Sequence, residues 1–150
     1  MAAKVILLLL RLALGGVFIY AGSIKAFATQ DFAHDIHRYD LVPWTDAVLL
    51  LAVYLPWLEI FSGLAVICRK LYLGGLAVLI TLTLIFLGAL TSAWTRGLDI
   101  ECGCFGREKA AIRTHFPSLL MRDLALLAAG ATLLLAERRN LSARLPKPAL

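Results

Sequence analysis

The chain has 150 residues, of which 61% are hydrophobic and 17% are charged. Soluble domains are about 45–50% apolar and about 25% charged, so this composition excludes an ordinary soluble domain. The net charge of +5 does not indicate nucleic-acid binding, because several basic residues flank apolar segments, where they anchor helices at lipid headgroups. One small domain embedded in a lipid bilayer is therefore expected.

Four apolar segments are long enough to cross a bilayer, whose hydrocarbon core of about 30 Å requires roughly 20 helical residues. Backbone groups in lipid need partners within their own segment, which favours α-helices. Short connections make neighbouring helices antiparallel, so the predicted fold class is all-α, an integral membrane four-helix bundle. The expected crossings are 5–21, 47–67, 73–94 and 119–136, in a domain of residues 1–137. The tail at 138–150 is expected to be cytoplasmic, and unstructured from Asn140 onward.

The segment between the first two crossings has Phe32, Ile36 and Tyr39 at helical spacing, with charged residues between them. Pro43 ends this pattern. One interpretation is a short amphipathic helix on the membrane surface, with Trp44 at the headgroups. An ordinary covering loop explains the pattern equally well.

Basic residues are almost evenly divided between the two sides, so the positive-inside rule gives a narrow preference. They lie closer together in the turn at Arg69 and Lys70 and in the C-terminal tail. This favours cytoplasmic termini, with the loop between the last two crossings facing outward.

That loop carries the strongest chemical signal, the motif Glu101-Cys102-Gly103-Cys104-Phe105-Gly106. Glycine between the cysteines permits the tight backbone that two sulfurs so close in sequence need in order to bond. Strain makes such a disulfide easier to reduce, which favours an exchanging bond over a permanent one. Arg107 would raise the thiolate fraction, whereas Asp99 and Glu101 act in the opposite direction, and His115 is placed to accept a proton.

Spacing alone leaves two other interpretations open, a static loop clip or half of a metal site. A zinc site needs four ligands, and only His34, His37 and His115 are available to join the pair. We therefore expect no metal site. Cys68 falls at the opposite end of the second crossing, too far away to resolve the pair, and is expected to be a small buried residue.

Arg11 and Glu59 lie inside otherwise apolar crossings, where ionised groups are costly unless they are paired or face a polar cavity. Their similar distances from matching helix ends predict that they are partners. The pair would either fix helix packing or line a pocket for protons or a lipophilic electron carrier. Lys25, Arg122 and Asp123 are expected to be interfacial anchors.

Taken together, these residues resemble the DoxX-like membrane proteins, and within them the methylamine-utilisation MauE type. The resemblance covers nearly the whole chain, and its most specific part is the Cys102-Gly103-Cys104-Phe105-Gly106 motif followed by Arg122-Asp123. The other matching positions are Gly22, Lys25, Phe32, Tyr39, Pro43, Pro56, Glu59 and Gly63.

The resemblance implies a bacterial inner-membrane protein that works with redox partners, in the methylamine case in disulfide formation of a periplasmic dehydrogenase subunit. Cys102 and Cys104 would cycle between dithiol and disulfide with a thioredoxin-like periplasmic partner, supported by Arg107, His115 and Arg122. The fold also looks similar to the vitamin K epoxide reductase class, which passes electrons from thiols to a quinone. This chain lacks a second cysteine pair, so a quinone cofactor is suggested by architecture alone. The alternatives are a non-catalytic scaffold and a small-molecule carrier that uses the intramembrane charges.

Overall fold

The computed structural model describes residues 2–40, 44–69, 71–97 and 112–144. These residues form helices and contain no strand, which confirms the all-α fold class. The helices are α1 (Ala2–Phe27), α2 (Thr29–Arg38), α3 (Thr45–Cys68), α4 (Tyr72–Thr95) and α5 (Ile112–Arg144).

Four of the helices are long and apolar enough to cross a membrane, over the spans Val5–Phe27, Thr45–Cys68, Tyr72–Thr95 and Phe116–Arg139. At most a third of the 18-residue window in each span is buried inside the bundle, and large apolar side chains such as Phe61 and Met121 point outward. A surface this apolar suits lipid. The four predicted crossings are thus confirmed, and the chain is an integral membrane helical bundle.

The helices extend beyond the predicted crossings at both ends, because hydropathy marks the apolar centre of a helix rather than its last hydrogen bond. The largest extensions are at the two ends of α5, which runs from Ile112 to Arg144. An unstructured tail from Asn140 onward was therefore a wrong expectation for residues 140–144. Residues 136–144 are rich in Ala, Leu, Glu and Arg, which favour helix beyond the apolar span.

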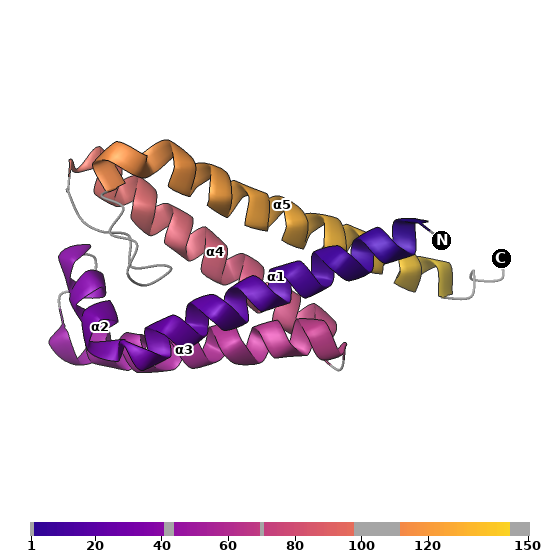
Figure 1. The fold of residues 1–150 in the computed structure, drawn as a ribbon, viewed down its shortest axis with the longest axis horizontal. Helices are drawn as coiled ribbons and strands as arrows, with labels where there is room; N and C mark the ends of the chain where they lie inside the picture. Colours follow the sequence, from indigo (N-terminus) through magenta and orange to yellow (C-terminus); the bar gives the residue numbers. More distant parts are fainter. Residues whose placement is uncertain (1, 41–43, 70, 98–111, 145–150) are drawn as a thin grey trace, which may run out of the picture.

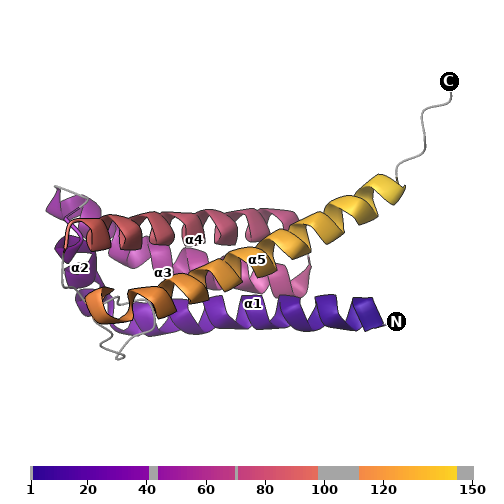
Figure 2. The same ribbon diagram turned by 90° about the horizontal axis from the view of Figure 1, so that it is seen from above.

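The four long helices lie side by side, with α2 at one end of the bundle and both chain termini at the other (Figure 1). We call these the α2 end and the terminal end. Helix α1 packs most extensively on α3, α3 packs on α4, and α4 packs on α5. Figure 2 shows α5 crossing the bundle at an angle to α1 and α4.

Glycines let α1 and α3 approach closely. A Cβ on Gly22 would lie 2.7 Å from the carbonyl oxygen of Pro56, and one on Gly15 would lie 2.9 Å from that of Gly63. Small residues commonly allow such backbone contact between membrane helices. These contacts fix the antiparallel register and bring the end of α1 alongside the middle of α3.

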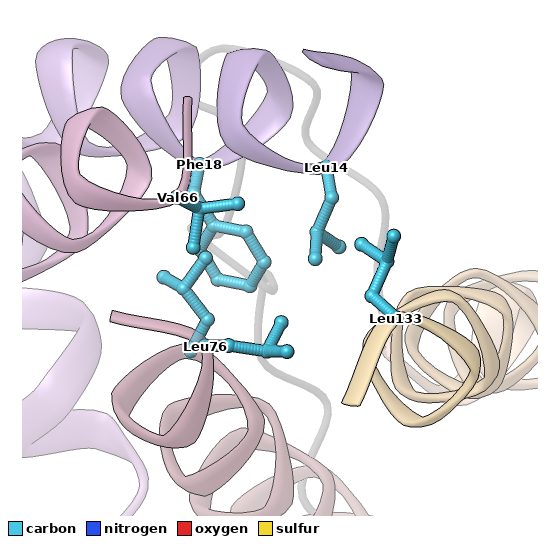
Figure 3. Close-up of a cluster of buried hydrophobic side chains, with 6 residues drawn as sticks. Leu14, Phe18, Val66, Leu76 and Leu133 are labelled. Carbon is cyan, nitrogen blue, oxygen red and sulfur yellow. The ribbon is translucent and has the colours of Figure 1, made fainter. Parts of the chain in front are cut away.

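Two apolar clusters are separated along the bundle. Leu14, Phe18, Val66, Leu76, Leu79 and Leu133 form the larger cluster, in which side chains from all four long helices converge (Figure 3). Leu90, Ala93 and Leu119 form a smaller cluster towards the α2 end. On α4, the residues between Leu79 and Leu90 therefore lie in the part of the bundle between the two clusters.

Helix α2 confirms that the segment before the second crossing forms a short helix, whereas its position on the membrane surface stays a prediction. Its Phe32 is buried in the bundle, and Trp44 just before α3 is 74% exposed. The guanidinium of Arg96, at the end of α4, donates hydrogen bonds to the carbonyl oxygens of Tyr39 and Asp40. Phe32 near the start of α2 and the hydrogen bonds from Arg96 just after its last residue therefore hold α2 against the bundle.

Candidate functional site

Glu59 is paired with Lys25, not with Arg11 as the sequence predicted. Lys25 Nζ lies 2.7 Å from Glu59 Oε1, and the two side chains are only 3% and 1% exposed. The expectation that Lys25 is an interfacial anchor was therefore also wrong. Its ammonium group lies inside the bundle between α1 and α3.

The register of α1 against α3 explains the wrong prediction. Gly22 lies against Pro56 and Glu59, whereas Gly15 lies against Gly63 and Ile67. Arg11 therefore lies level with the last turn of α3, roughly 16 Å from the level of Glu59 at 1.5 Å per residue. The predicted partnership assumed that α1 and α3 end together, but α1 continues past α3 at the terminal end (Figure 1).

Two aromatic rings complete the surroundings of the Lys25 ammonium. Lys25 Nζ lies 4.5 Å from the ring centre of Phe86 on α4 and 5.3 Å from that of Phe32 on α2. Cations are attracted to ring faces at such distances, and more strongly where water is excluded. Lys25 therefore contacts α2, α3 and α4 through one charged group.

A second charge pair lies beside the first, on α5. Arg122 Nη2 and Nε lie 2.9 Å and 3.0 Å from Asp123 Oδ1, and the side chains of Arg122 and Asp123 are 29% and 6% exposed. Asp123 is therefore buried, contrary to the expectation that it is an interfacial anchor. It enters the bundle because it lies on the face of α5 between Leu119 and Leu126, which both pack inward.

The two pairs share a cavity of about 30 Å³. Its walls come from all four long helices and consist of Val17, Phe18, Ala21, Lys25, Glu59, Thr83, Phe86, Arg122, Asp123 and Leu126. We call these residues the Lys25–Glu59 site. Drug-sized ligands need about 300 Å³ or more, so a quinone ring does not fit here in this state, whereas one or two water molecules do.

One carboxylate oxygen of Glu59 has no hydrogen-bond partner among the described residues. Oε1 accepts the hydrogen bond from Lys25, whereas Oε2 is buried without a hydrogen-bond partner among the described residues. Such a group is costly in a low-dielectric interior.

Arg11 belongs to a separate polar region at the terminal end. It lies within electrostatic range of Tyr72, as do Arg69 and Glu137. Arg69 Nη2 and Glu137 Oε2 are 3.8 Å apart, with the Arg69 side chain 60% exposed. Arg11 Nε is buried, with no hydrogen-bond partner in the described parts of the chain.

The predicted redox residues fall mainly outside the described residues, which stop at 97 and resume at 112. Cys102, Cys104 and Arg107 lie in that gap, and the side chain of His115, in the first turn of α5, is likewise outside the description. The described neighbours of the gap, the end of α4 and the start of α5, both lie at the α2 end (Figure 1). Cys68 lies at the terminal end, as expected, but it is exposed rather than buried because it is the last residue of α3.

Sequence reasoning missed the Lys25–Glu59 site although a signal was present. Gly15 and Gly22 are spaced by two helical turns on α1, and Gly63 lies on α3. Small residues at this spacing mark a close helix contact. Aligning Gly15 with Gly63 would have placed Lys25, one turn after Gly22, nearer to the level of Glu59 than Arg11.

Comparison with known proteins gives one match. Residues 3–136 match the family model described as methylamine utilisation protein MauE. No curated protein and no solved structure matches the chain.

Proposed function

The chain belongs to the MauE family of methylamine-utilisation proteins, and on this premise we propose that it is an inner-membrane thiol-disulfide redox protein. Cys102 and Cys104 exchange electrons with a periplasmic thioredoxin-like partner and so support disulfide formation or maturation of a periplasmic protein. The observation that carries this proposal is the Cys102-Gly103-Cys104 motif, because two sulfurs separated by one glycine are suited to a strained, exchangeable disulfide.

The positions of α4 and α5 support the proposal. The end of α4 and the start of α5, the described neighbours of the cysteine segment, both lie at the α2 end. With cytoplasmic termini, as the positive-inside rule favours, the segment faces the periplasm. A periplasmic partner then meets the cysteines without crossing the membrane.

The exchange proceeds in two balanced steps. A thiolate of the pair attacks a sulfur of the partner's disulfide, forming a mixed disulfide and releasing one partner thiolate, which takes up a proton. The second cysteine, as thiolate, attacks the mixed disulfide and releases the other partner thiolate. Two electrons pass to the partner, and Cys102 and Cys104 become a disulfide. In reverse, the same steps oxidise the partner's dithiol.

Arg107 and His115 support these steps by their charge and basicity. A cation near the pair stabilises the thiolate, and an imidazole can accept the thiol proton. Arg122 lies at the start of the membrane-crossing part of α5 and holds Asp123 through its guanidinium. It supports the reaction only indirectly, by neutralising that carboxylate.

The experiment is mixed-disulfide trapping in intact cells. We expect Cys102→Ser or Cys104→Ser to accumulate a mixed disulfide with the partner, because the second attack is then blocked. The double variant should trap nothing while still inserting in the membrane. Cys68→Ser is the matched control, since it removes a sulfur at the opposite end and should leave trapping unchanged. Mixed disulfides that persist in the double variant would contradict the proposal.

A redox titration separates exchange from a static clip. An exchanging pair should titrate near the potential of its compartment, whereas a structural disulfide resists reduction until below about −300 mV. Alkylation of the two thiols, followed by mass spectrometry across a series of glutathione buffers, measures the midpoint. A midpoint in the structural range would favour a non-catalytic scaffold.

A further inference from the structure

Glu59, whose Oε2 has no hydrogen-bond partner among the described residues, also lines the cavity. A buried carboxylate oxygen is normally hydrogen-bonded, and Glu59 Oε2 has no such partner among the side chains described. The cavity of about 30 Å³ exceeds the 10–15 Å³ or so that one water molecule needs. A buried water is held by roughly two to four polar groups. The cavity walls include five polar residues, Lys25, Glu59, Thr83, Arg122 and Asp123.

Apolar clusters lie on both sides of the site along the bundle, and a polar residue connects the site to the surface. The larger apolar cluster fills the bundle on the side of the terminal end, and Leu90 with Leu119 fills it on the other side. Arg122, in contrast, lines the cavity and keeps 29% of its side chain exposed. Polar groups therefore run from the surface of α5 through Asp123 to Glu59.

We propose that the Lys25–Glu59 site binds water and is a proton-binding site, in which water joins Glu59 Oε2 to Asp123 and delivers protons from the Arg122 side. The step is a transfer from a hydronium ion to the Glu59 carboxylate, which gives a neutral carboxyl and a water molecule. The proposal does not depend on the thiol chemistry.

The formal charges of the groups around Glu59 balance one another. Lys25 from α1 faces it directly, and Arg122 and Asp123 come from α5. Helix α4 contributes Thr83 and Phe86, and α2 contributes Phe32 through Lys25; none of these titrates. With Asp123 ionised the four charged groups sum to zero, so one added proton leaves a single positive charge next to two aromatic rings. Ring faces tolerate such a charge.

Infrared spectroscopy of the full chain in bilayers tests the proposal. On acidification, the wild type should gain more carboxylic C=O absorption than Glu59→Gln, and the difference between the two spectra is a Glu59 band that shifts in D₂O. Glu137→Gln is the matched control, because it makes the same change at the terminal end and should retain the band. Identical acid spectra for wild type and Glu59→Gln would overturn the proton site.

A second measurement avoids any variant and so cannot fail through misfolding. In solid-state NMR of bilayer samples, the Glu59 carboxyl carbon is identified by its contact with ¹⁵N-labelled Lys25 Nζ, 2.7 Å from Oε1. Magnetisation transferred from water protons should reach this carbon as fast as it reaches the carbons of exposed carboxyl groups. Transfer no faster than to the buried methyl groups of Leu76 would overturn the water site.

Discussion

Two regions along the bundle hold ion pairs of very different character. Between the two apolar clusters, Lys25 and Glu59 are 2.7 Å apart and almost fully buried, and aromatic rings surround the cation. At the terminal end, Arg69 and Glu137 are 3.8 Å apart and partly exposed. Buried pairs are strongly coupled and expensive to break, whereas exposed pairs contribute little. The Lys25–Glu59 pair therefore lies inside the bundle, whereas the Arg69–Glu137 pair lies at its surface.

Removing Lys25 should have the largest effect on stability. Lys25→Met leaves the Glu59 carboxylate buried without its cation, and breaking a buried pair in this way costs about 3–5 kcal/mol. The free energy of unfolding in mixed micelles measures the loss. Lys25→Met combined with Glu59→Met should recover most of it, because two apolar side chains leave no unpaired charge. If the double variant is less stable than Lys25→Met, the pair is not the source of the loss.

The close approach of α1 and α3 places Lys25 beside Glu59, and Gly22 tests it. Gly22→Ala puts a methyl group 2.7 Å from the Pro56 carbonyl oxygen, and such overpacking costs about 1–3 kcal/mol. Gly16→Ala is the control on the same helix, because a Cβ there meets no atom within 4 Å in the described parts of the chain. Both changes gain the same helix propensity, so the difference between their unfolding free energies isolates the contact. Equal values would mean that the helices can move apart freely.

The aromatic ring of Phe86 should contribute a smaller, specific energy. We expect a coupling of about 0.5–2 kcal/mol between Phe86 and Lys25, because the ring face attracts the ammonium group. A double-mutant cycle with Phe86→Leu and Lys25→Met measures it and removes the packing change common to both backgrounds. A coupling of zero would show that Phe86 acts only as an apolar wall.

The sequence predicted the elements of this fold better than their relative positions. Long apolar runs identified the four crossings, and the spacing of Phe32, Ile36 and Tyr39 indicated α2. Hydropathy does not report where a helix ends, and Lys25, coming after the apolar run, was taken for an anchor although it lies in the last turns of α1.

The hydropathy pattern therefore could not predict which charged residue pairs with Glu59. Which charge meets Glu59 depends on the register of α1 against α3, and a slide of a few residues exchanges one partner for another. That register is fixed by glycine contacts between helices distant in sequence. The cysteine motif, by contrast, is a local signal that sequence supplies directly, and it stays a prediction because its residues lie outside those described.

The smallest effect is expected at the terminal end. Arg69→Ala removes an ion pair whose cation is 60% exposed, and such pairs are worth about 0–1 kcal/mol. The loss should also shrink with added salt, because exposed charges are screened over roughly 10 Å at 0.1 M. Unfolding in mixed micelles at low and high salt, with Lys25→Met measured alongside, gives the contrast. The Lys25→Met loss should change little with salt, since its pair lies where ions do not enter. If both losses respond equally to salt, the Lys25–Glu59 pair is not shielded from solvent, and the distinction between the two ion pairs fails.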